Sequence, residues 1–111
     1  MIKFINMWKA MNMCIKYKRD IKEVNYNEIN INEYILIDVR SKREFKESHL
    51  ENAINIPLLD IKRKIELYVR QKDKKVLIYC EYGGRSAKAA KILNDIGYIN
   101  IFNLRGGLEK I

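Results

Sequence analysis

Residues 76–93 read VLIYCEYGGRSAKAAKIL, and they predict a strand, a tight turn and a helix in direct succession. The first four are apolar β-formers, which is typical of a buried strand. The following run of Ala, Leu and Lys favours a helix that Ser86 would cap and Gly97 would end. Cys80 lies between these two elements, so the turn surrounds its side chain.

The composition of the turn indicates chemistry at Cys80. Gly83 and Gly84 tolerate conformations that other residues resist, so backbone N–H groups can converge there, with the positive end of the helix dipole behind them. Such a setting lowers the pKa of a thiol and favours the nucleophilic thiolate. A lone cysteine at a strand end is more often a small buried hydrophobe, but that role requires neither paired glycines nor Arg85 aimed at the turn. We therefore expect a reactive cysteine.

Short apolar runs alternate with helical patterns along the chain, which predicts a parallel sheet covered by helices. Capping-box spacing marks two helix starts, at Asn25 with Glu28 and at Ser41 with Glu44. An amphipathic pattern predicts a helix over residues 58–70, and a short final helix is expected over 107–111. The expected strands are 22–24, 34–38, 54–56, 76–79 and 99–103.

Several polar residues follow the ends of predicted strands. Ligands bind at the carboxyl ends of strands in an open parallel sheet, so Asp38, Arg40, Cys80 and Arg105 should share one edge. We expect Asp38, Arg40 and Glu44 to form a polar brace beside the turn, with a supporting and not a chemical role.

The stretch from Cys80 to Ser86 resembles the active-site loop of rhodanese-like sulfurtransferases, in which a cysteine begins a six-residue loop ahead of a helix. Three further segments resemble that family's pattern, in its order and spacing from about Lys22 onward. Two departures are the polar residues around His49 and the acidic Glu81 beside the cysteine, where many thiosulfate-using members have neutral or basic residues. The segments are DVR at 38–40 with EF at 44–45, SHLENAINIP at 48–57, and NLRGGL at 103–108.

This resemblance implies an α/β, rhodanese-like fold with a parallel five-stranded sheet flanked by helices on both faces. It implies a sulfurtransferase in which Cys80 carries a sulfane sulfur as a persulfide. The donor would be thiosulfate or a low-molecular-weight persulfide and the acceptor a thiol or cyanide, with a protein acceptor as a further candidate. No cofactor or metal is expected. The substrate-binding residues would be Glu81, Tyr82, Gly83, Gly84, Arg85 and Ser86.

Individual roles follow for some of these residues. Arg85 either orients an anionic donor or locks the turn, and both roles remain open. Ser86 would combine helix capping with a hydrogen bond to sulfur. Tyr82 would stand at the pocket mouth, and His49 would fix its loop by a hydrogen bond instead of acting as a base.

Two other functions compete with sulfur transfer. Cysteine phosphatases and arsenate reductases also place a cysteine-to-arginine loop before a helix, but phosphatase loops have five residues between the two, and here there are four. A low-turnover persulfide carrier serving a protein partner is the alternative from a different class. An inactive scaffold is disfavoured, because such modules tend to lose the cysteine.

Composition excludes several further classes. A chain of 111 residues predicts one domain, which we place at 21–111. Two cysteines and one histidine are too few for a disulfide framework or a four-ligand zinc site. The net charge is +8, but residues 1–20 hold five Lys/Arg against one Asp, so half of it lies outside that domain. Nucleic-acid binding needs a continuous basic face, and the sequence shows none.

The first twenty residues have their own pattern. Basic residues interrupt the apolar stretch before a signal peptide could form, and no run is long enough for a membrane helix. We expect a loosely ordered basic extension, with a membrane-surface helix as the alternative, and a cytoplasmic protein without stable membrane insertion. Cys14 is expected to be a free thiol, the alternative being a resolving cysteine.

Overall fold

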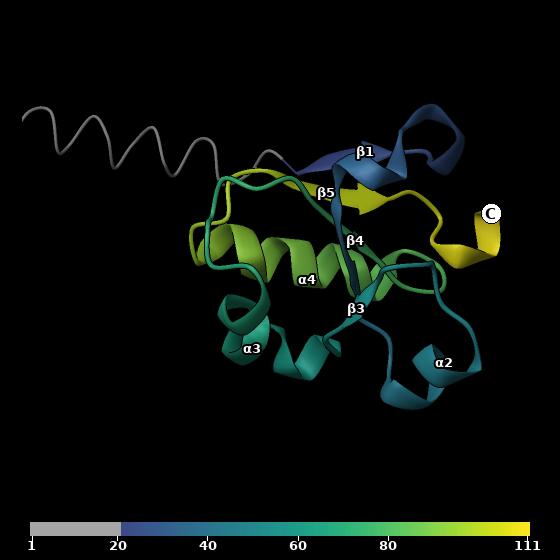
Figure 1. Cartoon of the computed structure of the whole chain (residues 1–111), viewed down its shortest axis with the longest axis horizontal. Coiled ribbons are helices and arrows are strands. Elements are labelled where there is room, and N and C mark those ends of the chain that lie inside the picture. Colours follow the sequence, from purple (N-terminus) through teal and green to yellow (C-terminus); the bar gives the residue numbers. More distant parts are fainter. Residues whose placement is uncertain (1–20) are drawn as a thin grey trace, which may run out of the picture.

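The computed structural model describes residues 21–111, which form a five-stranded sheet in which every strand pair is parallel (Figure 1). The strand order is β1-β5-β4-β2-β3. The cysteine-bearing strand β4 is therefore central, between β5 and β2. The strands are β1 (Lys22–Val24), β2 (Ile35–Asp38), β3 (Ile54–Asn55), β4 (Val76–Tyr79) and β5 (Ile101–Leu104).

Helices cover both faces of this sheet, as expected. On one face α3 and α4 pack against Val76 and Ile78 of β4. On the other face Leu77 and Tyr79 pack against residues of η2 and η4 and against the loop around Leu50. The helices are α2 (Lys42–Glu47), α3 (Ile61–Tyr68), α4 (Gly84–Asp95) and the 3-10 helices η1 (Tyr26–Glu28), η2 (Ile31–Glu33), η3 (Leu58–Asp60) and η4 (Leu108–Lys110).

The central position of β4 explains its sequence. A strand with helices on both faces has no solvent-facing side, so it reads as a continuous apolar run instead of an alternating one. All four of its residues are 0% exposed. The turn that follows is thus attached to the most deeply buried part of the sheet.

Some local predictions hold and others are wrong. The capping box of Ser41 with Glu44 is present. Asn25 does not cap a helix through its side chain, because it donates instead to Glu28 Oε1 at 3.0 Å and only a 3-10 turn forms. The predicted helix over 58–70 is divided into η3 and α3 and ends at Tyr68, and the final helix is a 3-10 turn. The expectations about residues 1–20, including Cys14, lie outside the described residues.

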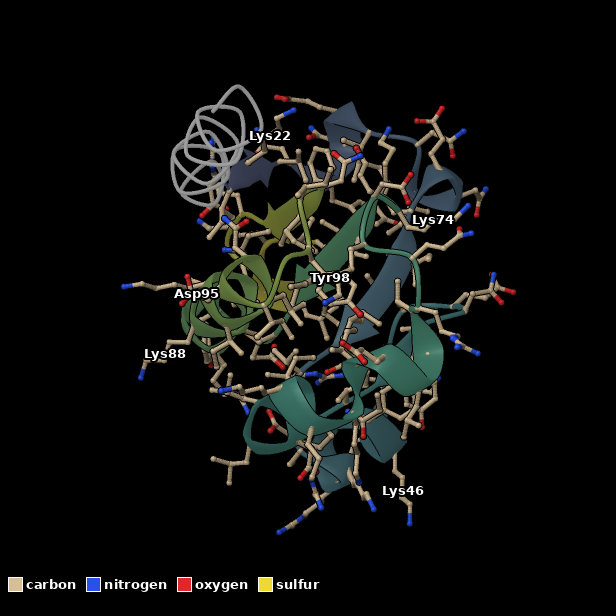
Figure 2. The ribbon with its side chains drawn as sticks, turned by 90° about the vertical axis from the view of Figure 1, so that its left-hand side faces the viewer. Lys22, Lys46, Lys74, Lys88, Asp95 and Tyr98 are labelled. Carbon is tan, nitrogen blue, oxygen red and sulfur yellow. The ribbon has the colours of Figure 1, made fainter. Side chains whose placement is uncertain are left out.

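The amino-terminal edge of the sheet is closed by side-chain contacts. Figure 2 faces this edge, with Tyr98 at its centre. The hydroxyl of Tyr98 donates to Val69 O at 2.5 Å, and Lys72 Nζ donates to Ile96 O at 2.8 Å. Cys80 lies at the opposite, carboxyl-terminal edge. No helix within residues 21–111 combines the length and hydrophobicity needed to cross a bilayer.

Candidate active site

The side chain of Cys80 lies inside the turn between β4 and α4, and the residue is 1% exposed. Gly83 N donates to its Sγ at 3.0 Å and Ser86 N donates at 3.4 Å. Sulfur also lies 3.4 Å from Ser86 Oγ. Three donors or potential donors therefore point at one sulfur atom.

These groups decide the ionisation of the thiol. Burial raises the pKa of Cys80, but the hydroxyl of Ser86 and the backbone N–H groups of Ser86, Gly83 and Tyr82 lower it, and the net pKa lies below its usual value. Hydrogen bonds to the charged form favour that form. The turn thus increases the fraction of thiolate at neutral pH.

The backbone of the turn depends on one glycine of its pair. Gly83 has φ +107° and is the N-cap of α4, a conformation that L side chains rarely adopt. Gly84 does not share this need, because its φ is not positive and an added Cβ would meet nothing within 4 Å. The expectation that both glycines are required for the turn is therefore wrong for Gly84.

Ser86 is not the helix cap that the sequence predicted. Because Gly83 starts α4 earlier, Ser86 falls within its first turn and is 0% exposed. Its hydroxyl donates to Gly83 O at 3.1 Å while the thiol of Cys80 donates to Ser86 Oγ. A hydroxyl can rotate, so it can turn its proton toward sulfur once the thiol is ionised.

The β2 side of the turn is held by a buried ion pair. Arg40 Nη2 lies 2.8 Å from Asp38 Oδ2, with Nε 3.1 Å from both carboxylate oxygens. The two side chains are 3% and 0% exposed. Arg40 also reaches the turn itself, since its Nη1 lies 3.4 Å from Glu81 Oε1, and Nη2 donates to Ser48 O.

Glu44 belongs to a separate pair. Arg85 donates to Glu44 Oε1 at 2.7 Å and to Oε2 at 2.9 Å, so both Nη atoms are occupied. Hydrogen bonds from Arg85 and from Ser41 hold the pKa of Glu44 at about 2, against a raising effect of partial burial. The expected single brace of Asp38, Arg40 and Glu44 is therefore two separate ion pairs, Asp38 with Arg40 and Glu44 with Arg85. In this structure Arg85 locks the turn to α2.

The β5 side of the turn is held by backbone contacts. Leu108 N donates to Cys80 O at 3.0 Å, and Glu109 N donates to Glu81 O at 2.9 Å. Gly107 has φ +64°, and a Cβ there would lie 2.5 Å from both carbonyl oxygens. The closing glycine pair thus allows the chain after β5 to lie directly against the cysteine loop.

The structure also places two other residues that the sequence singles out. His49 Nδ1 lies 2.7 Å from Phe45 O, and its ring stacks on Phe45 with centroids 3.7 Å apart, consistent with a residue that fixes its loop. Tyr82 follows Glu81 in the turn and is 73% exposed.

Sequence reasoning missed some supporting contacts. Asn55 Nδ2 donates to Asp38 O at 3.0 Å and to Arg40 O at 2.9 Å, which fixes the chain after β2. The hydroxyl of Tyr79 accepts from Leu50 N at 3.1 Å. No local pattern marks either residue, because their partners are backbone groups distant in sequence. Within residues 21–111 no group of three His, Cys, Asp or Glu could hold a metal.

The family model for the rhodanese-like domain matches residues 22–111. The chain belongs to that family. It is 40% identical over 75 residues to thiosulfate sulfurtransferase PspE of Escherichia coli (strain K12), a match that covers 68% of this chain and 71% of PspE. The resemblance drawn from the sequence is confirmed, and the chain is a sulfurtransferase of the rhodanese type.

Two further comparisons agree. Adenylyltransferase and sulfurtransferase UBA4 of Candida albicans is 37% identical over 101 residues, covering 86% of this chain and 23% of UBA4. The chain therefore spans about a quarter of that relative. A rhodanese-related protein from Thermoplasma volcanium has a TM-score of 0.71 and 32% identity, covering 79% of this chain and 87% of that structure. The parallel sheet with its helices is the fold of this family.

Proposed function

We propose that Cys80 is the catalytic residue and carries a sulfane sulfur as a persulfide. The observation that supports this most directly is the set of groups around Sγ, from Gly83 and Ser86, together with a lowered thiol pKa. A thiolate stabilised before the substrate arrives is the nucleophile that covalent sulfur transfer needs.

In the first half-reaction the Cys80 thiolate attacks the outer sulfur of the donor. With thiosulfate the S–S bond breaks, sulfite leaves with the bonding electrons, and Cys80–S–S⁻ forms. With a persulfide R–S–S–H the leaving group is R–S⁻, which takes up the proton released by the new persulfide. The name of PspE supports thiosulfate as a donor.

In the second half-reaction an acceptor attacks the outer sulfur of the persulfide. Cyanide leaves as thiocyanate and a thiolate R′–S⁻ leaves as R′–S–S⁻, and either regenerates the Cys80 thiolate. The loop from Glu81 to Ser86 holds the anionic persulfide through its N–H groups. Tyr82 borders the mouth of the loop.

The remaining assignments are the residues that support the loop and the part of the chain that carries out the reaction. Asp38, Arg40 and Glu44 keep the loop in place without touching the sulfur. We assign the reaction to residues 21–111, and the family model, which matches residues 22–111, supports this assignment.

A carrier that passes sulfur to a protein partner is the second candidate. Two observations favour it: Glu81 adds negative charge beside the cysteine, and UBA4 joins a sulfurtransferase to an adenylyltransferase in one chain. Phosphatase or arsenate reductase chemistry is less favoured, because Arg85, the arginine that would bind the oxyanion, is bound by Glu44.

Intact-mass measurement tests the proposal. The protein is incubated with thiosulfate, with glutathione persulfide and with cysteine, and then with cyanide. We expect the gain of one sulfur atom from at least one sulfane donor, its removal by cyanide, and its absence in Cys80→Ser. Cys14→Ser is the matched control and should gain sulfur normally.

Turnover separates the candidates. An enzyme forms thiocyanate from thiosulfate and cyanide over many cycles, whereas a carrier gains sulfur but forms little thiocyanate. Sulfur gained by Cys80→Ser, or release of phosphate from an aryl phosphate that needs Cys80, would contradict the proposal.

A further inference from the structure

The amino-terminal edge of the sheet, opposite Cys80, has exposed apolar side chains that sulfur transfer does not use. Leu67 and Tyr68 end α3 and are 76% and 52% exposed. Ile99 lies two residues before β5 and is 62% exposed. Single exposed apolar residues are ordinary on a protein surface, whereas a group of them indicates a site of interaction.

Hydrogen bonds place these residues on one surface. Ile99 N donates to Lys72 O at 3.0 Å, and Lys72 Nζ donates to Ile96 O at 2.8 Å. Asn100 Nδ2 donates to Asp73 O at 3.2 Å. The loop after α3 and the loop before β5 therefore lie side by side on the edge that Figure 2 faces.

The same surface is cationic. Residues 66–75 contain four Lys/Arg and two Asp/Glu. Two of these cations are paired with acidic residues. The other two, Arg70 and Lys74, are exposed and make no ion pair with another residue of the range 21–111. This edge therefore has positive charge that the described part of the protein does not neutralise.

Arg70 lies between two hollows of about 490 Å³ and 370 Å³. Each hollow combines two cations with an exposed apolar side chain. The first is lined by Glu66, Leu67, Arg70 and Lys72, and the second by Tyr68, Arg70 and Lys74 among others. The two hollows together thus present alternating positive charge and apolar surface.

The basic first segment of the chain joins the fold at the same edge. Residues 1–20 hold five Lys/Arg against one Asp and lead directly into Ile21 and β1. β1 begins at Lys22, which Figure 2 shows on the edge facing the viewer. Half of the net charge of the chain is therefore attached at this edge.

The combination of charge and apolar side chains favours a lipid bilayer as the ligand. An anionic bilayer presents phosphate groups in one plane with hydrocarbon below them, and it attracts Lys and Arg near its surface. Tyrosine suits the interface itself, and apolar side chains enter the boundary with the acyl chains. An acidic peptide matches the charges but gives no reason for three large apolar side chains to protrude beside them.

We propose that the amino-terminal edge binds the surface of an anionic bilayer, without any helix crossing it. Arg70 and Lys74 lie against the phosphate groups, and Leu67 enters the acyl boundary. Cys80, at the opposite edge, faces away from the bilayer and stays open to its substrates. The inference does not depend on the proposed function, because it uses none of the groups around the sulfur.

Sedimentation with vesicles tests the role of the charges. The full chain should bind vesicles of phosphatidylcholine with phosphatidylserine, and not vesicles of phosphatidylcholine alone. High salt should weaken this binding, because the Debye length falls from about 10 Å at 0.1 M to about 3 Å at 1 M. In Arg70→Gln/Lys74→Gln we expect binding about 25-fold weaker, roughly fivefold for each cation.

The matched control removes the same charge from the other end of the molecule. Lys42→Gln/Lys46→Gln changes two exposed cations of α2, which Figure 1 places away from the loop after α3. This variant should bind the vesicles nearly as the wild type does. Absence of binding to the anionic vesicles, or equal losses in the two double variants, overturns the inference.

A second variant tests the apolar contact. Leu67→Ser keeps every charge and should weaken vesicle binding about tenfold, in line with the burial of one leucine side chain. Soluble poly-L-glutamate offers negative charge without a bilayer, so its binding should be weaker than that of the vesicles and unaffected by Leu67→Ser. Binding of poly-L-glutamate as tight as that of the vesicles would indicate an acidic protein partner and overturn the inference.

The reactivity of Cys80 tests the orientation. In Cys14→Ser, which leaves one thiol, iodoacetamide is an uncharged reagent whose reaction with Cys80 is followed by intact mass. We expect the same rate for the free and the vesicle-bound protein. A rate that falls tenfold or so on the vesicles would place the Cys80 edge against the bilayer and overturn the inference.

Discussion

The turn around Cys80 has two flanks that are held by different physical means. On the β2 flank charged side chains hold it: Asp38 with Arg40, and Glu44 with Arg85. On the β5 flank Gly107 lets backbone N–H groups reach the carbonyl oxygens of the turn. The first flank depends on the presence of particular side chains and the second on the absence of one.

The two flanks should therefore tolerate different substitutions. An ion pair is lost when either partner is neutralised, and the cost grows with burial because the remaining charge stays unpaired in a poorly polarisable environment. A glycine contact does not titrate, but any added Cβ forces the backbone apart. Charge-removing substitutions should therefore disturb the β2 flank, and Gly→Ala substitutions should disturb the β5 flank.

The largest expected effect is on the buried pair of the β2 flank. Arg40→Gln leaves Asp38 buried without its counter-charge and should lower the free energy of unfolding by about 3–5 kcal/mol. Urea denaturation measures this. Adding Asp38→Asn should recover part of the loss, because the two residues are coupled. A single variant as stable as the wild type would show that the buried pair does not hold this flank.

The β5 flank should respond next most strongly. Gly107→Ala places a Cβ 2.5 Å from Cys80 O and Glu81 O, so the turn must shift. We expect a loss of about 1–3 kcal/mol in unfolding free energy together with reduced sulfur transfer. Gly84→Ala is the matched control, since its Cβ meets nothing, and it should be neutral or stabilising. Similar losses of unfolding free energy in both variants would show that Gly107 is no more required than Gly84.

A smaller effect is expected at the sulfur, which neither flank contacts through a side chain. Ser86→Ala removes the hydroxyl that helps to lower the pKa of Cys80, so that pKa should rise. Persulfide formation at neutral pH should slow on the order of tenfold, the size of a hydrogen bond to a charged group. The measurement is the pH dependence of the loading rate, whose midpoint should move to higher pH. An unchanged midpoint would show that the backbone N–H groups alone set the pKa.

The smallest effect is expected at the half-exposed pair of the β2 flank. Glu44→Gln should cost about 0.2–1 kcal/mol at neutral pH, because solvent screens the pair. The pKa of Glu44 is lowered from 4.5 to about 2 in the folded chain, so its contribution is present above pH 4.5 and is lost as pH falls toward 2. Urea titrations across this range should show the wild type and the variant converging. Glu47→Gln, which removes a charge of the same helix from the exposed pair with Arg43, is the matched control.

Local patterns predicted much of the fold because their causes are local. The apolar run of β4, the box of Ser41 with Glu44 and the end of α4 near Gly97 each depend on neighbours within a few residues. A serine before an alanine-rich run favours a cap, so the local pattern predicts that α4 starts at Ser86. The left-handed conformation of Gly83 instead starts the helix earlier, and Ser86 is a partner of sulfur.

The candidate site likewise has features that the sequence predicts and features that only tertiary packing sets. The sequence by itself determined the family, the parallel sheet and a cysteine followed by a glycine-rich turn at a strand end. Only the tertiary structure decided how the charges pair: Arg40 with Asp38 and Glu81, and Arg85 with Glu44, residues up to 41 positions apart in sequence. The physical reason is that ion pairing depends on distances in space, which β2, β4 and α4 set by packing together, while turn and strand propensities act along the chain.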